Sequence, residues 1–501
     1  MALNDRDGSI SDAVESARTR AQETQTTQWL AWRMRLPGCD PLAVWAAAEG
    51  DVRFFWEQPA AERALAATGA SFEFTAEGPT RIGDAAIRAR QVMARVHVAG
   101  EAAPLAAGPL LVGGFAFDDA HAAQGEWSRF PGARLVLPRM LVSRIGEDVY
   151  CTLVEAIEPG AAPTQGVAAL EERSAAVRSF EGMRWVDEGE HESPHLGGAL
   201  GARAGSWPPG AEYRVLADRP HEVFRTQVAE AVACIRDAEF EKVVLARSLE
   251  VQHPGRFDLP GFLHRLRGIY PHCTVLAFGD GEDTLLAATP ELLVALEGDT
   301  VRACALAGSQ RRGRTPEEDE ALGRELLEDK KNLAEHAAVE RALRAVLEDA
   351  CAGLEAPNHP ELMRIEGIQH LATPMRGQLS EAASPKPDVL DLVDRIHPTP
   401  AVAGEPSAVS IGWIAEKEGL DRGWYAGPVG WIDRHGGGEF WLALRSGLVR
   451  NPERGSSQRA TPWARARLYA GVGIVSGSQP DQELRETRIK LRALLAPLTE
   501  I

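Results

Sequence analysis

The feature that most constrains the fold of this chain is a series of closely spaced strand patterns in its last hundred residues. Segments 424–433, 439–449 and 468–475 are rich in β-branched, aromatic and aliphatic residues, and only the turn-forming sequence RHGGG separates the first two. Strands joined by so short a turn pair antiparallel. The sequence therefore predicts an antiparallel meander, followed by a helix that begins near Pro480.

Strand and helix patterns also occur earlier in the chain. Residues 241–251 (EKVVLARSLEV) predict a strand, and residues 292–296 and 301–307 predict two strands joined by the hairpin turn EGDT. Thr315, followed by proline and two glutamates, predicts the start of one or two helices that end near Cys351. The same criteria predict strands at 110–118 and 148–157 and helices at 165–180 and 221–237. These strands and flanking helices indicate the α+β class.

Composition excludes several classes of protein. The 501 residues are 44% hydrophobic and 25% charged, which is typical of a soluble globular protein. No segment approaches the ~18 uninterrupted apolar residues that a membrane-spanning helix needs. The formal charge of −18 disfavours binding to nucleic acid or to an anionic membrane, so a site for a small anion must supply its own positive charge. Six widely spaced cysteines, without a CxxC pair, predict reduced thiols.

Composition along the chain predicts three regions. Residues 1–28 are polar and lack the apolar segment of a secretory signal, which predicts a flexible tail and a cytoplasmic protein. Residues 29–214 form an N-terminal half that ends in a loop rich in Gly, Pro and Ser at 187–212. Residues 215–501 carry most of the chemically suggestive side chains and are predicted to form the catalytic region.

Lys242 is unusual because it lies inside an apolar strand pattern, on the same face as Val244 and Ala246. A buried ammonium without a partner is costly. Lys242 is therefore either an edge-strand lysine that blocks aggregation or a buried amine that burial favours in its neutral, basic form. Glu291 follows Thr-Pro at a strand start, where it is either a solvated turn residue or a carboxylate aimed into a cleft.

Several other residues allow both a chemical and an ordinary structural interpretation. Glu335, Glu483 and Glu486 are either ligands for a hard cation such as Mg²⁺ or solvated helix residues. Gly471 and Gly473 could present backbone amides to an anion, although a GxG sequence is weak evidence.

Three polar residues near the C-terminal strands are similarly ambiguous. Arg445 is predicted on a strand, either as a fork for a carboxylate or as a surface arginine. His370 and Thr373 fall in a segment that looks like a loop, where polar side chains ordinarily hydrogen-bond to the backbone of a turn.

The order of several short segments carries more information than any one of them. These segments are EKVVLAR at 241–247, TPELL at 289–293, LAGSQRRG at 306–313, KNLAEH at 331–336, HLATP at 370–374, HPTPAVAG at 397–404, WYAGPVGW at 424–431, EFWLALRSGL at 439–448 and LYAGVGIVSGSQPDQELRETRIKL at 468–491. Taken together, they resemble the chorismate-utilising enzymes, which include isochorismate, salicylate, anthranilate and aminodeoxychorismate synthases. The resemblance covers about residues 220–501, and the first 200 residues match loosely, mainly through GGFAFD at 113–118.

The resemblance implies a fold and a reaction. The fold is one large α+β unit in which two mostly antiparallel sheets pack face to face with helices outside. A lysine at position 242 is typical of members that add water at C2 of chorismate, whereas members that add ammonia typically carry glutamine there. Ala307 stands where aminodeoxychorismate synthases usually carry a nucleophilic lysine. The resemblance thus predicts a Mg²⁺-dependent isochorismate synthase, of the menaquinone or siderophore type.

The resemblance also implies residue roles. Lys242 takes a proton from the attacking water, and Glu291 protonates the departing C4 hydroxyl. Glu335 and Glu486 bind Mg²⁺ directly and Glu483 binds it through water, while the metal holds the C1 carboxylate. The substrate-binding residues implied are Thr373, His370, Tyr425, Arg445, Gly471, Gly473 and Lys490.

Three alternatives remain at this stage. A salicylate synthase would make the same intermediate and then eliminate pyruvate. An anthranilate synthase component I would use ammonia and a glutaminase subunit, which Lys242 disfavours, so no obligatory glutaminase partner is expected. A non-catalytic chorismate-binding protein would lack some of the chemical residues, whereas all of them are present in this chain.

Overall fold

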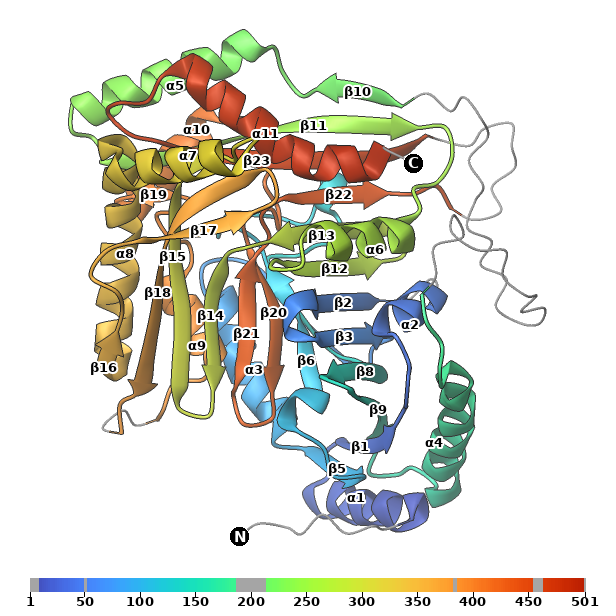
Figure 1. Ribbon diagram of the computed structural model, residues 1–501. Coiled ribbons are helices and arrows are strands. Elements are labelled where there is room, and N and C mark those ends of the chain that lie inside the picture. Colours follow the sequence, from blue (N-terminus) through green and yellow to red (C-terminus); the bar gives the residue numbers. More distant parts are fainter. Residues whose placement is uncertain (1–8, 49–51, 186–212, 382–384, 454–462, 500–501) are drawn as a thin grey trace.

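The computed structural model describes residues 9–48, 52–185, 213–381, 385–453 and 463–499. These residues form two large β-sheets with helices packed around them, and in Figure 1 the strands of one sheet run across the view while those of the other run up and down. The predicted α+β fold with two sheets is confirmed. Among the described residues, the only parallel strand pair is β1 with β5, so the sheets are mostly antiparallel as expected.

The larger sheet has thirteen strands. In spatial order they are β10 (Arg214–Ala217), β11 (Lys242–His253), β23 (Ala464–Ile474), β22 (Ser446–Arg450), β13 (Asp283–Thr289), β12 (Thr274–Asp280), β2 (Arg53–Gln58), β3 (Arg63–Thr68), β8 (Met140–Ile145), β9 (Asp148–Ile157), β1 (Gln28–Arg35) and β5 (Val96–Gly100), with β19 (Gly404–Glu405) beside β11.

The smaller sheet has ten strands. In spatial order they are β16 (Cys351–Glu355), β18 (Ile368–Leu379), β15 (Thr300–Arg311), β14 (Leu292–Glu297), β21 (Gly438–Leu442), β20 (Pro428–Asp433), β6 (Leu110–Phe115), β7 (Ala133–Leu137) and β4 (Phe72–Ala76), with β17 (Glu361–Ile365) beside β18. Both sheets take strands from the first and the second half of the chain.

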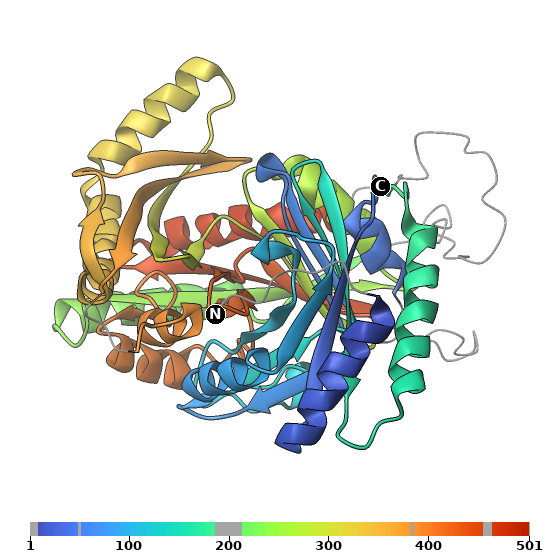
Figure 2. The same ribbon diagram turned by 90° about the horizontal axis from the view of Figure 1, so that it is seen from below.

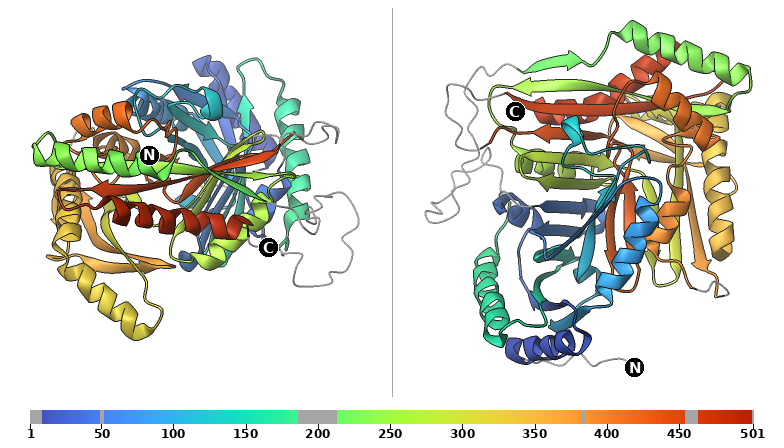
Figure 3. Two further views of the ribbon diagram at one scale, coloured as in Figure 1. Left: turned by 90° about the horizontal axis from the view of Figure 1, so that it is seen from above. Right: turned by 180° about the vertical axis from the view of Figure 1, so that it is seen from behind.

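Helices cover the outer faces of the sheets. They are α1 (Ile10–Thr24), α2 (Pro41–Ala47), α3 (Arg81–Met93), α4 (Pro163–Val177), α5 (His221–Arg236), α6 (Leu259–Ile269), α7 (Pro316–Glu328), α8 (Lys330–Ala350), α9 (Val389–Ile396), α10 (Ser407–Lys417) and α11 (Pro480–Thr499). Helices α1 and α4 lie side by side at one end of the larger sheet (Figure 2). Helix α11 packs on β23 beside α5, whereas α3, α8 and α9 pack on the smaller sheet (Figure 3). No helix among the described residues is long and apolar enough to span a membrane.

Two of the places where the chain crosses from one sheet to the other are neighbours. One crossover lies between β13 and β14, and the other lies between β21 and β22. Strand β22 pairs with β13, and β21 pairs with β14. Backbone hydrogen bonds from Ala288 to Arg445 (3.1 Å) and from Leu442 to Glu291 (3.1 Å) hold the two crossovers together. This seam between the sheets brings side chains from both sheets to one place.

The structure corrects the prediction for residues 1–28. Residues 10–24 form helix α1, whose Ser9 cap accepts a hydrogen bond from the amide of Asp12. Val14, Ala17 and Ala21 are buried at helical spacing against β1 and α4. The apolar stripe consists largely of alanine, which explains why the segment looked like a polar tail. The loop predicted at 187–212 lies outside the described residues.

The structure also corrects three predictions in the second half of the chain. The strand predicted at 439–449 is broken into β21 and β22, which belong to different sheets. Residues 424–427, predicted as the start of a strand, form turns before β20. His370 and Thr373 lie within strand β18 rather than in a loop, because β15 and β17 pair with β18 on either side. The predicted hairpin, the Thr315 cap and the helix from Pro480 are confirmed.

Candidate active site

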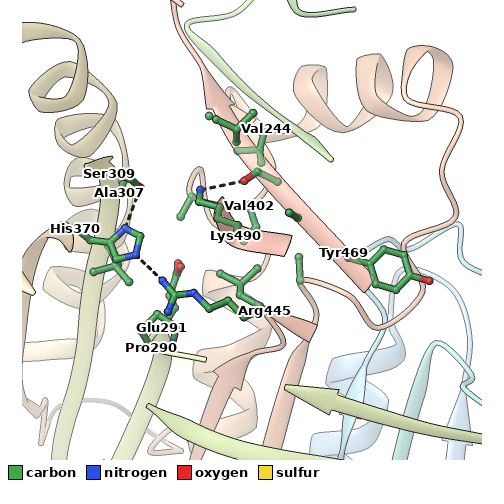
Figure 4. Close-up of a pocket in the computed structure, with 18 of the residues that line it drawn as sticks. Val244, Pro290, Glu291, Ala307, Ser309, His370, Val402, Arg445, Tyr469 and Lys490 are labelled. Carbon is green, nitrogen blue, oxygen red and sulfur yellow. Dashed lines mark hydrogen bonds between the residues drawn. The ribbon is translucent and has the colours of Figure 1, made fainter. Parts of the chain in front are cut away.

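A cavity lies at the seam between the sheets, and residues from both sheets line it. Its walls come from β11, β15, β18, β23, α8, α11 and the two crossovers. Figure 4 shows the side chains that converge on it. Eight predicted residues line this cavity: Glu291, Glu335, His370, Tyr425, Arg445, Gly471, Gly473 and Lys490.

Glu291 lies on the first crossover, and its amide donates to the hydroxyl of Thr289 at 3.2 Å. Burial raises the pKa of Glu291 to about 8, although the positive charges of Lys242 and Lys490 partly oppose this effect. The carboxyl group is therefore largely protonated at neutral pH and can donate a proton to a bound molecule. Glu291 is buried, which excludes the solvated-turn interpretation.

Arg445 lies on the second crossover, with a left-handed backbone (φ 46°) at the break between β21 and β22. Its side chain is only 7% exposed. Nη2 donates to Nε2 of His370 at 2.9 Å, whereas the buried Nη1 has no hydrogen-bond partner. No carboxylate pairs with this guanidinium in the described part of the chain, and burial lowers its pKa. A buried cation with a free donor is costly unless an anion meets it, so Arg445 is suited to bind an anion.

Lys242 begins β11 between β19 and β23, and its side chain is 1% exposed. It is therefore not an exposed edge lysine. Its Nζ lies 3.2 Å from Oε1 of Glu335, without the geometry of a hydrogen bond. Burial opposes ionisation of Glu335, but the nearby lysines outweigh that effect and lower its pKa. Lys242 does not line the cavity itself; it lies next to Glu335, which does.

Three carboxylates from α8 and α11 each contact a lysine. Besides the pair of Lys242 with Glu335, Lys331 lies 2.7 Å from Glu483 and Lys490 lies 2.8 Å from Glu486. The carboxylates also act together, because burial opposes the charge of Lys331 but Glu483, Glu335 and Glu486 together raise its pKa. This local balance of three acidic and three basic groups differs from the acidic surface of the protein as a whole.

The three carboxylates have the chemistry that Mg²⁺ prefers, but each of them is paired with a lysine in this structure. Carboxylate oxygens are the ligands that Mg²⁺ prefers, and Oε2 of Glu483 is buried without a hydrogen-bond partner. However, within the described ranges, no three acidic, His or Cys side chains gather closely enough to hold one metal ion. A cation here would require Glu335 and Glu486 to turn away from their lysines.

Gly471 and Gly473 of β23 form one wall of the cavity. A side chain at Gly471 would collide with the Tyr425 hydroxyl, and one at Gly473 would collide with Glu335. The residues opposite them in β11 donate their amides to the side away from β23. In an antiparallel pair the two glycines must then also direct their amides outward, which agrees with the predicted presentation of N–H groups to an anion. Lys490 donates to the Gly471 carbonyl at 3.0 Å.

Thr373 lies behind the cavity wall. Its hydroxyl is buried and lies 2.7 Å from Nε2 of His336, which reaches across from α8. Thr373, Glu483 and Glu486, like Lys242, do not line the cavity itself. The structure thus brings the predicted residues into one region, in an inner set around the cavity and an outer set that contacts it.

Several residues at the site were not assigned from the sequence. Among them, Ser309 and Tyr469 line the cavity, Lys331 pairs with Glu483, and His336 contacts Thr373. All four lie within the motif segments 306–313, 331–336 and 468–491, so the signal was present but their partners were not visible. The side chain of Tyr469 stacks on Tyr425 with ring centroids 5.0 Å apart.

This fold and site define a chorismate-binding enzyme. The family described as "Chorismate binding enzyme" matches residues 13–499, so the chain belongs to that family along almost its whole length. The match extends through the first 200 residues, where the motif resemblance was loose.

Individual relatives are similar over nearly their full lengths. The chain is 30% identical over 493 residues to isochorismate synthase MenF of Bacillus subtilis, covering 96% of this chain and 95% of that protein. It is 33% identical over 489 residues to the salicylate biosynthesis isochorismate synthase of Pseudomonas aeruginosa, covering 97% and 94%. The structure of MenF from Escherichia coli shares its fold, with a TM-score of 0.71 and 22% identity over 98% of this chain and all of that one.

Proposed function

We propose that this protein is a Mg²⁺-dependent isochorismate synthase, which adds water at C2 of chorismate and removes the C4 hydroxyl. The observation that carries the proposal is a cavity lined by a protonated Glu291, by Arg445 with its unpaired Nη1 and by Glu335, with Lys242 directly behind Glu335. The names of the two full-length relatives support the same reaction.

In the proposed mechanism, Arg445 and the amides of Gly471 and Gly473 hold the carboxylates of the substrate. Glu291 gives its proton to the departing hydroxyl, which its raised pKa permits at neutral pH. Lys242, as the neutral amine, accepts a proton from the attacking water on the other side of the ring. The reaction needs one group that accepts a proton from the attacking water and one group that donates a proton to the departing hydroxyl.

Mg²⁺ would be held by Glu335 and Glu486, with Glu483 acting through water. When bound, it would neutralise the carboxylates and position the C1 carboxylate of the substrate.

Product analysis tests the reaction. Purified protein incubated with chorismate and Mg²⁺ is expected to form a product of unchanged mass with the ultraviolet spectrum of isochorismate. Release of pyruvate without a second enzyme would instead identify a salicylate synthase. Ammonia-dependent formation of anthranilate would identify the amine-adding reaction and revive a glutaminase partner. Binding of chorismate with no product at all would identify a non-catalytic protein.

We expect Glu335→Gln to raise the Mg²⁺ concentration needed for half-maximal activity by at least about tenfold, because one charged ligand is lost. A magnesium titration of initial rates, with metal-free enzyme as the starting point, measures this shift. Glu340→Gln is a matched control, since Glu340 lies one and a half turns along the same helix and pairs with Arg344 instead. An unchanged requirement in Glu335→Gln would contradict the proposed ligand.

The product could enter menaquinone or siderophore biosynthesis. Similar proteins include both kinds, such as the menaquinone-specific isochorismate synthase of Escherichia coli and a vibriobactin-specific isochorismate synthase of Vibrio cholerae. All six cysteines are free, which supports the proposal of a reducing, cytoplasmic location.

A further inference from the structure

Three polar side chains form a continuous hydrogen-bonded chain along one wall of the cavity (Figure 4). Arg445 Nη2 lies 2.9 Å from Nε2 of His370, and Nδ1 of the same ring lies 2.9 Å from Oγ of Ser309. All three residues line the cavity, and His370 is buried. Both ring nitrogens of His370 are therefore occupied by protein groups.

The direction of each hydrogen bond follows from the chemistry of its partner. A guanidinium can only donate, so Nε2 of His370 must accept and carries no proton. Burial, with the charges of Arg445 and Lys490, holds the pKa of His370 well below its usual range, so the ring is neutral. Its single proton must then be on Nδ1, which donates to Oγ of Ser309 and also faces the backbone carbonyl of Gly308. The Ser309 hydroxyl proton is left for another acceptor.

The backbone fixes Ser309 in this position. The pairing of β15 with β18 shifts by one residue between Ala307 and Ser309, where Gly308 has a left-handed backbone (φ 77°). Such a bulge re-aims the side chain that follows it. The amide of Ser309 is also held, because it donates to Oδ1 of Asn332 at 3.1 Å. Ser309 is thus anchored from α8 as well as from His370.

We propose that His370 is a positioning residue rather than a direct substrate contact. It holds two donors toward the cavity, Nη1 of Arg445 for a substrate carboxylate and the Ser309 hydroxyl for an uncharged hydroxyl or ether oxygen. Only the identity of those oxygens rests on the proposed function. The fixed tautomer of His370 and its coupling to Ser309 do not depend on the reaction.

The test is a double-mutant cycle on the dissociation constant of chorismate, measured by calorimetry with Mg²⁺ present. Ser309→Ala is expected to weaken binding about tenfold in the wild-type background, from loss of one hydrogen bond. The loss should persist in His370→Asn, because the Asn amide occupies the place of Nδ1 and still donates to Ser309. It should fall below about twofold in His370→Phe, which keeps a ring but no donor. Equal losses in all backgrounds would overturn the proposal.

Two further measurements separate positioning from other roles. The pH profiles of wild type and His370→Asn should rise and fall at the same pH values. The substitution should raise KM more than it lowers kcat. Loss of one limb of the profile would instead show that His370 carries a proton in the reaction. Nitrogen-15 NMR of labelled histidine in the ligand-free enzyme should show a proton on Nδ1 and none on Nε2, and the opposite tautomer would overturn the proposal even if no isochorismate is formed. Ser143→Ala, which removes a buried hydroxyl of β8 that donates to Ala107, is the matched control and should leave binding unchanged.

Discussion

Lys242→Ala is expected to lower kcat by about 10²–10⁴-fold while the protein stays folded, because under the proposed mechanism the variant lacks the base that accepts a proton from water. Neither of the two neighbouring lysines in the described residues is placed to replace it. Lys331 and Lys490, the other lysines in contact with the acidic groups, have partners of their own in Glu483 and Glu486. Steady-state kinetics with chorismate, compared with thermal unfolding of the same samples, measures the effect.

The substitution leaves Glu335 without its ion-pair partner, so the fold needs a separate check. Lys242→Gln keeps a polar group near Glu335 and should be as inactive as Lys242→Ala but closer to the wild type in stability. Lys386→Ala removes a lysine from a surface pair with Asp299 and should behave like the wild type. Turnover of folded Lys242→Ala within about tenfold of wild type would show that another group is the base.

The second large effect concerns pH. With a pKa of about 8, Glu291 holds its proton below that pH and loses it above. If Glu291 is the general acid, its ionisation should make kcat fall about tenfold for each pH unit above about pH 8. Glu291→Gln cannot donate a proton as an acid, so it should be slower by about 10²–10⁴-fold and lack this alkaline decline. Rates measured across the pH range with both proteins provide the comparison.

The same group also predicts a pH dependence of stability. The folded protein keeps the Glu291 proton to about pH 8, whereas the unfolded chain releases it near the ordinary carboxyl pKa. This group therefore favours the folded state fully at low pH, and its contribution is lost as pH rises through that window. Glu291→Gln should remove this component from the unfolding curves. An identical decline in stability between these two pKa values in Glu291→Gln and wild type would assign the decline to another residue.

Most individual elements could be predicted from local sequence, whereas their arrangement could not. The full length of strand β9 could be predicted because most of its ten residues are apolar, aromatic or β-branched. The break between β21 and β22 was missed because both strands are buried, so the apolar pattern continues through the crossover. Helix α1 was missed because small alanines form most of its buried stripe.

For the site, the motif pattern predicted residue identities but not their contacts. Lys242, Glu335 and Glu486 come from β11, α8 and α11, and nothing local in the sequence indicates which lysine faces which carboxylate. The same holds for the hydrogen bonds of His370, because Ser309 and Arg445 are distant in the chain. Distances between remote segments depend on how two sheets pack, and that information is not contained in short patterns.

The position of Glu291 and Arg445 on the two crossovers between the sheets has a consequence for engineering. Strands β2 and β6, from the first quarter of the chain, pair directly with β12 and β20 from the later part. Residues 215–501 expressed alone would expose the edges of β12 and β20. The two crossovers would then lack the neighbouring strands β2 and β6 that hold the sheets in place. Truncation to the motif-bearing segment should therefore yield an aggregating, inactive polypeptide, and co-expression of the missing piece is the route by which activity would return.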